Sequence, residues 1–293
     1  ENKLQFRQWA FSLHDILARD YGYSSDTISL LYDRGEVEGS GTERIDAACD
    51  LQGIEAELAR LQSIVKTGDQ ITIYLIGHGS GSDEESKFNI VGPDITGIQF
   101  AAMLDIFDQQ DMIIVNTTSA SYGFSASLSG EGRVVVSSTR SSSEKFDPVF
   151  SNYFIEALDS RNGDRDKNNR VSILEAFNYA KSNVEEFYEE KGRLASEHAG
   201  LDDNGDALFS LNPTTAEIDG RLAEIAYIDN LVDDTVGLSA EAIRLKSRMQ
   251  DLERSVFILR GRKAEFLEDD YWQQLEVLLV DLARATGQFN EQV

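Results

Sequence analysis

Up to Pro213, short apolar runs alternate with longer stretches in which apolar residues recur at helical spacing. The apolar runs 27–32, 71–76, 112–115 and 134–136 predict strands. Between them, the 3.6-residue period predicts helices. The predicted helices cover residues 3–20, 54–65, 95–107, 122–129, 149–158 and 173–188.

Strands that alternate with helices favour right-handed crossovers. We therefore expect residues 1–213 to form an α/β domain, with a mostly parallel sheet and helices on both of its faces. The segment 79–86 is rich in Gly, Ser and acidic residues and predicts a loop.

After Pro213 the pattern changes to a heptad repeat. Its apolar seam, interrupted at Lys263, consists of Leu245, Met249, Leu252, Val256, Leu259 and Phe266. A second apolar stripe, Leu275, Leu278, Leu279 and Leu282, follows a predicted break at residues 268–270. Residues 214–293 are thus expected to form a coiled-coil-like helical hairpin. This hairpin packs on the sheet domain, or it binds a protein partner or a second copy of the chain.

The composition excludes some functions. Among 293 residues, 52 acidic and 27 basic side chains give a formal charge of −25, which repels nucleic acid. No apolar stretch approaches the ~20 residues that span a bilayer. The single cysteine, Cys49, excludes an intrachain disulfide and is interpreted as a plain small residue.

Two of the predicted strands are followed by residues that can do chemistry. His78 comes after the run 71–76, and Ser119 comes after the run 112–115. The carboxyl ends of parallel strands meet at one edge of a sheet, so these two side chains are expected there together. His78 is a candidate general base and Ser119 a candidate nucleophile.

These segments resemble known motifs. Tyr74-Leu-Ile-Gly-His-Gly-Ser80 resembles the strand and His-Gly signature of the caspase, legumain and gingipain superfamily of cysteine peptidases. Asp111-Met-Ile-Ile-Val-Asn-Thr-Thr-Ser-Ala-Ser121 resembles the strand before the superfamily's catalytic Cys, in its legumain-like bacterial branch. The resemblance covers roughly residues 4–210 and implies a caspase-like fold.

Aligned without a gap, the catalytic Cys falls on Ser119, while the Gly that usually follows soon after falls on Tyr122. A shift by one residue would bring Gly123 into step but would place Ala120 at the nucleophile, so we prefer Ser119. In either register there is no Cys. Three origins remain open: an introduced Cys replacement, a natural pseudoenzyme, or a working serine hydrolase.

The resemblance also implies roles for individual residues. His78 would be the base, Ser119 the nucleophile, and the amides of Gly79 and Ser119 the oxyanion donors. Arg140 and Glu144 would line the primary pocket, where Arg140 favours an acidic substrate side chain and Glu144 a basic one. Because a hydroxyl is far less acidic than a thiol, a site built for Cys is expected to lose most of its peptidase activity with Ser.

Residues 164–175 match the twelve-residue calcium loop of EF-hands. Loop positions 1, 3, 5, 7, 9 and 12 fall on Asp164, Asp166, Asn168, Arg170, Ser172 and Glu175. Asn169 stands at the position of the usual Gly and tolerates a positive φ. Oxygen ligands without His or Cys favour calcium, here in a structural role, and a calcium loop favours an extracytoplasmic location.

Further polar residues are interpreted more plainly. The acidic turn 201–206 has too few ligands for a predicted cation site. His14 and His198 are expected to be surface or packing residues. Two functional hypotheses follow: an impaired peptidase that acts on a peptide or protein, or a non-catalytic binding module that acts through the C-terminal helices.

Overall fold

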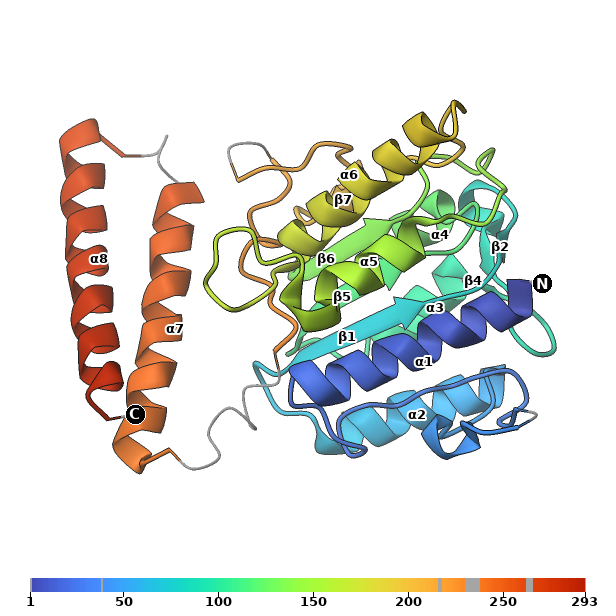
Figure 1. The fold of residues 1–293 in the computed structure, drawn as a ribbon, viewed down its shortest axis with the longest axis horizontal. Helices are drawn as coiled ribbons and strands as arrows, with labels where there is room; N and C mark the ends of the chain where they lie inside the picture. The colour runs from blue at the N-terminus through green and yellow to red at the C-terminus, as the bar shows by residue number, and fades with distance from the viewer. Residues whose placement is uncertain (1, 38, 216–217, 230–237, 262–265, 293) are drawn as a thin grey trace. The chain divides into compact units, whose positions relative to one another are not determined.

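A computed structural model describes the chain except for residues 1, 38, 216–217, 230–237, 262–265 and 293. The chain divides into two compact units, Glu1–Asp229 and Asn230–Val293. The first is a mixed α/β unit, and the second contains the two long C-terminal helices (Figure 1).

The central sheet of the first unit has the strand order β1-β5-β6-β7. Its strands are β1 (Gln70–Leu75), β5 (Asp111–Asn116), β6 (Arg133–Ser137) and β7 (Gly200–Asp202). The first three are parallel and β7 is antiparallel to β6, so the expected mostly parallel sheet is confirmed. The short strand β7 was not predicted.

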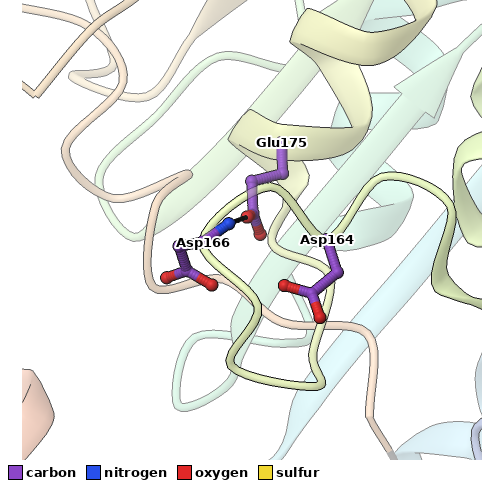
Figure 2. Close-up of side chains that lie close together, drawn as sticks. All are labelled: Asp164, Asp166 and Glu175. Carbon is purple, nitrogen blue, oxygen red and sulfur yellow. Dashed lines mark hydrogen bonds between the residues drawn. The ribbon is translucent and has the colours of Figure 1, made fainter.

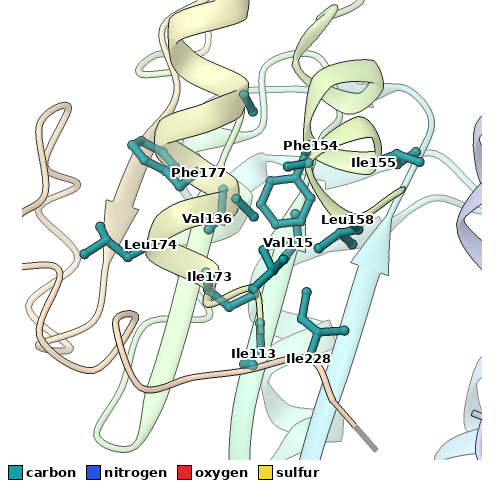
Figure 3. Close-up of a cluster of buried hydrophobic side chains, with 14 of the residues drawn as sticks. Ile113, Val115, Val136, Phe154, Ile155, Leu158, Ile173, Leu174, Phe177 and Ile228 are labelled. Atoms are coloured by element: carbon teal, nitrogen blue, oxygen red, sulfur yellow. The ribbon is translucent and has the colours of Figure 1, made fainter. Parts of the chain in front are cut away.

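Helices cover both faces of this sheet, as expected. Successive residues of a strand point to opposite faces, so one strand can contribute side chains to two core clusters. Ile113 and Val115 of β5 belong to one core cluster, shown in Figure 3, and Met112 and Ile114 belong to the other. The first cluster includes residues of α1 (Asn2–Asp20), α5 (Phe150–Leu158) and α6 (Ile173–Glu190). The second includes residues of α2 (Leu51–Ile64), α3 (Gly97–Leu104) and α4 (Tyr122–Ala126).

A small antiparallel sheet follows β1. It contains β2 (Gly79–Ser80), β3 (Lys87–Phe88) and β4 (Ile95–Thr96). A turn of 3₁₀ helix, Asp83–Glu85, connects β2 to β3. The segment 79–86, predicted as a loop, therefore forms part of a folded hairpin beside the end of β1.

The predicted strand 27–32 is wrong. The segment starts with a turn. The amides of Thr27 and Ile28 and the Thr27 hydroxyl donate hydrogen bonds to the Ser24 carbonyl, and the Ser24 amide donates to the Thr27 hydroxyl. Beyond this turn, the segment makes one isolated bridge, between Leu31 and Ala47. Among the strands that the structure describes, β1 lies at the edge of the central sheet.

The boundary between the two units lies after Asp229 rather than at Pro213. Ala223, Ala226 and Ile228 are buried in the first core cluster. In addition, the amide of Ile173, the first residue of α6, donates to the Ala226 carbonyl. Residues 214–229 thus complete the α/β unit, although they show neither a helical nor a strand period.

The second unit is a pair of helices, α7 (Ala240–Gly261) and α8 (Glu268–Asn290), that pack against each other. Phe266 lies beyond the end of α7, so the predicted seam stops before it, and Lys263 is outside the described residues. The acidic run 268–270, predicted as a break, is the first turn of α8, where negative charge favours the helix dipole. Among the described helices, none combines the length and apolar character that crossing a membrane requires.

The burial of residues 214–229 yields a stability prediction. Ile228 is 1% exposed, whereas Ile218 in the same segment is 69% exposed. We expect Ile228→Ala to lower the free energy of unfolding by about 2–4 kcal/mol, because it leaves a cavity in the core. The matched change Ile218→Ala should cost less than ~0.5 kcal/mol. Urea unfolding of the full chain measures both, and equal effects would contradict the boundary after Asp229.

Candidate functional site

The two predicted catalytic residues follow neighbouring parallel strands. His78 comes after β1 and Ser119 after β5, and these strands pair in register up to Leu75 and Asn116. At this edge the Gly79 amide donates to Ser119 Oγ over 3.3 Å, and the Ser119 hydroxyl donates to the Gly79 carbonyl, also over 3.3 Å. The structure therefore brings the His-Gly pair and Ser119 together at the carboxyl end of the sheet.

The close approach at Gly79 leaves no room for a side chain. A Cβ at this position would lie 2.2 Å from the Ser119 carbonyl oxygen and 2.8 Å from Thr118 Oγ1. The residue after His78 must therefore be glycine for the two strand ends to meet as they do. Ala120, which follows Ser119, has a φ of 50°, so the chain turns sharply after the candidate nucleophile.

His78 has a carboxylate partner that sequence analysis missed. Its Nδ1 lies 2.8 Å from Oδ1 of Asp147, and its ring packs edge-on against Phe6 with centroids 4.8 Å apart. A carboxylate oxygen at this distance attracts an N–H and repels a lone pair, which favours the hydrogen on Nδ1 and leaves the lone pair of the neutral ring on Nε2. Asp147 thus favours the tautomer of His78 in which Nε2 is the basic nitrogen.

The Ser119 hydroxyl is buried within this arrangement. The residue is 3% exposed, and its two hydroxyl contacts are with main-chain atoms of Gly79. The turn that carries Ser119 is fixed on both sides: the Thr118 hydroxyl donates to Asn116, and the Ala120 amide donates to the Glu144 carbonyl over 2.8 Å. The candidate nucleophile is therefore well positioned but largely covered.

A cluster of buried hydroxyls ties this turn to the end of β6. Ser121 Oγ lies 2.9 Å from Ser137 Oγ, 3.2 Å from Ser138 Oγ and 3.0 Å from Thr139 Oγ1. All four residues are fully buried. Ser121 therefore has a structural role in connecting the two strand ends.

The predicted pocket residues Arg140 and Glu144 contact each other. The Glu144 carboxylate accepts hydrogen bonds from the amides of Arg140 and His198, and its Oε1 lies 2.6 Å from His198 Nδ1. The Arg140 Nε is 3.4 Å from the same oxygen, while its side chain is about half exposed. Glu144 thus holds the segment together, and Arg140 is the more exposed charge of the two.

A second buried carboxylate anchors the start of α5, close to Asp147. Glu197 accepts hydrogen bonds from the amides of Val149 (2.9 Å) and Phe150 (3.0 Å) and from the Tyr188 hydroxyl (3.0 Å). Burial raises the pKa of Glu197. These bonds satisfy free amides at a helix N-terminus and fix the segment that carries Asp147.

The predicted metal loop precedes α6. Asp164, Asp166 and Glu175 each bring a carboxylate oxygen within 4.8 Å of the others (Figure 2). Burial, together with the nearby Glu175 and Asp164 carboxylates, raises the pKa of Asp166. Asn169 has a φ of 65°, the conformation expected where EF-hand loops carry Gly. The structure therefore brings three of the six predicted ligands together.

The other three predicted ligands make contacts within the loop or beside it. Asn168 Oδ1 accepts a hydrogen bond from the Arg170 amide. The Arg170 guanidinium pairs with Asp229 and lies over the Tyr227 ring. Ser172 caps α6 in a reciprocal capping box with Glu175.

The acidic turn after β7 binds main-chain amides. Asp203 accepts hydrogen bonds from the amides of Gly220 (3.0 Å) and Ala223 (2.8 Å), and Asp219 accepts one from the Asp203 amide (3.2 Å). Burial raises the pKa of Asp203 and raises that of Asp219 to about 6. This turn therefore connects residues 214–229 to β7.

No protein-family model matches this chain, and no curated protein is significantly similar to it. A functional assignment therefore rests on the residues of the site and on their geometry.

The raised pKa of Asp219 predicts a pH dependence of stability. The native state holds this proton more tightly than the unfolded chain, so Asp219 reduces stability as the pH rises from about 3.8 to about 6. Asp219→Asn keeps the shape and the hydrogen-bond acceptor but removes the titration. We expect the variant to lose less stability than the wild type between pH 4 and 6.5, in urea unfolding at closely spaced pH values. Parallel curves for the two proteins would contradict this expectation.

Proposed function

We propose that this chain is a caspase/legumain-like peptidase-fold protein of the legumain-like branch, with a His/Ser site in place of His/Cys. In this form it is inactive or strongly impaired as a peptidase. The observation that carries the proposal is the contact between the Ser119 hydroxyl and the main chain of Gly79. This contact joins the two motifs of the resemblance at one edge of a parallel sheet.

In the proposed mechanism, Asp147 holds His78 with Nε2 as the basic nitrogen. Nε2 would take the proton from the nucleophile at position 119 and later give it to the leaving amine. The Gly79 amide would donate to the oxyanion. Asp147 acts through His78 and is therefore a positioning residue.

Three features support an impaired rather than an efficient hydrolase. The Ser119 residue is almost fully buried, so a substrate carbonyl has little access to it. Its hydroxyl hydrogen is directed to the Gly79 carbonyl, and the proposed oxyanion donor is directed to the same hydroxyl. A Ser hydroxyl also requires a stronger base than a Cys thiol does.

The substrate or ligand of this site would be a peptide or protein segment. The Glu144 carboxylate already binds His198 and the Arg140 amide, whereas the Arg140 side chain is half exposed. Arg140 therefore supports a preference for an acidic side chain next to the site.

We also propose that residues 164–175 bind calcium. The carboxylates of Asp164, Asp166 and Glu175 would supply most of the charge, with Asn168, the Arg170 carbonyl and, through water, Ser172 completing the ligands. Calcium would offset the repulsion among three close carboxylates. Its role would be structural, since the loop leads into α6.

A non-catalytic binding module is the alternative, and one observation favours it: α7 and α8 form a compact unit of their own. In that case the peptidase-like unit is a scaffold, and binding through the helices would not depend on His78.

Placing a thiol at position 119 tests the first proposal. In a Cys49→Ala background, we expect Ser119→Cys to react with a peptidyl electrophile and to gain measurable peptide hydrolysis. Ser121→Cys is the matched control, because its side chain contacts the hydroxyls at the end of β6 rather than the main chain of Gly79 beside His78, and it should not react. Burial raises the pKa of Cys49 to about 11, and the Cys49→Ala background removes the remaining reactivity of this thiol. Mass spectrometry of the adducts measures both variants.

Asp147→Asn, added to Ser119→Cys, is expected to lower hydrolysis by roughly 10²-fold or more, because Asn does not fix the basic tautomer of His78. The pH profile of the reaction should shift as well, which a purely structural role of Asp147 would not cause. A folded Ser119→Cys protein that stays inert to substrates and electrophiles would favour the scaffold.

The calcium proposal predicts a specific loss. Glu175→Gln should abolish calcium binding in titration calorimetry while keeping the capping box with Ser172, since Gln can make the same hydrogen bonds. In the wild type, calcium at a hundred times its Kd should add about 2.7 kcal/mol to the free energy of unfolding. Asp206→Asn, in the other acidic turn, should leave this gain unchanged. A wild-type melting temperature indifferent to both calcium and chelator would exclude the site.

A further inference from the structure

The helix α8 has a wider apolar surface than a two-helix hairpin requires. Its first seam, Tyr271, Leu275, Leu278, Leu282 and Ala285, repeats every four and three residues, and Tyr271 and Ala285 are buried. Trp272 follows Tyr271 in the sequence, and Leu279 follows Leu278. Trp272 is 49% exposed and Leu279 is 47% exposed. A heptad labelled from the first seam places them at position e, beside the a and d positions.

These exposed residues line an open groove along α8. The groove consists of Trp272, Leu275, Glu276, Leu279, Val280 and Ala283. Five of the six are apolar, and they span about three turns of the helix. The groove is therefore a continuous stripe rather than a single exposed side chain.

The other helix, α7, supplies one neighbour of α8. Its seam uses a and d positions, and among its described side chains Ala242, Leu245 and Leu259 are buried. Apolar residues at a, d and e together, as in α8, suit a helix that packs on two neighbours in a bundle. Since α7 supplies one neighbour, the pattern of α8 indicates a second.

Charge and length favour a second copy of the hairpin as this neighbour. The sequence of α7 contains five basic and three acidic residues, and that of α8 contains five acidic residues and one basic. Packing α8 on α8 of another copy would bring like charges together, but packing it on α7 of another copy pairs opposite charges. The two helices have 22 and 23 residues, so they match along their whole length.

From this pattern we infer that the protein forms a homodimer in which the groove of α8 packs on α7 of the second copy. The two hairpins form a four-helix bundle around a two-fold axis, with each groove covered once. Ile243 of α7, which is 40% exposed beside the buried Ala242, supplies apolar surface for this contact. The inference does not depend on the proposed peptidase-like site.

Light scattering after gel filtration of the full chain tests the inference. We expect a mass of twice the 32.6 kDa chain at micromolar concentration. Leu279→Glu places a charge in the groove and should weaken the dimer by at least about a hundredfold, with unchanged helix content. Val277→Glu is the matched control: Val277 is 57% exposed on the same helix but outside the groove, so this variant should remain dimeric.

Ionic strength tests which helices meet. Opposite charges between α8 and α7 of the second copy predict a dissociation constant that rises with salt, whereas an α8–α8 contact would tighten as salt screens its repulsion. A monomeric wild type, or a Leu279→Glu dimer of undiminished stability, would overturn the inference. If the wild type is a monomer and Leu279→Glu lowers its melting temperature, the groove of α8 makes a contact within the same chain instead.

Discussion

The arrangement of the candidate site depends on the parallel pairing of β1 with β5. The two strands are the same length and pair in register from Gln70 and Asp111 to Leu75 and Asn116, so they end at the same level. Because β5 is buried on both faces, a shift of one residue would turn its apolar side chains to the wrong core cluster. The hydrophobic core thus fixes the register, and the register places Ser119 against Gly79. The polar contacts at the edge of the sheet follow from this alignment.

Carboxylates hold the segment between β6 and α5 in place around this edge. Glu144 binds His198, Asp147 binds His78, and Glu197 binds the first amides of α5. Two of the three histidines in the chain therefore meet a carboxylate of the same short segment. The protein has a formal charge of −25, so neighbouring carboxylates repel one another. Here each of the two carboxylates has a histidine ring as a fixed partner instead. The orientation of the candidate base is in this way coupled to the loop that would contact a substrate.

The sequence predicted the strands that carry the site because their apolar runs are short, uniform and buried on both faces. It did not predict Asp147, since Lys145-Phe-Asp-Pro148 has the composition of an ordinary turn and its partner His78 is distant in sequence. The boundary at Pro213 was wrong for a related reason: Ala223 and Ala226 are small residues in an irregular segment, and their burial depends on tertiary contacts with α6. Periodicity detects regular elements, but it does not detect side chains that meet across the fold.

Helix α5 connects the candidate site to the acidic loop. Its first amides are bound by Glu197 next to the segment of Asp147, and shortly after its last residue the chain enters the loop that begins at Asp164. The Gly163 amide donates to the Ala157 carbonyl, so the entry to the loop is bonded directly to α5. In that loop, the main-chain amides of Arg165, Asp166, Asn168 and Asn169 donate to the clustered carboxylates and partly offset their repulsion. A cation bound there would stabilise the loop where it joins α5 and α6, and it would thereby stabilise the helix whose other end positions the partner of His78.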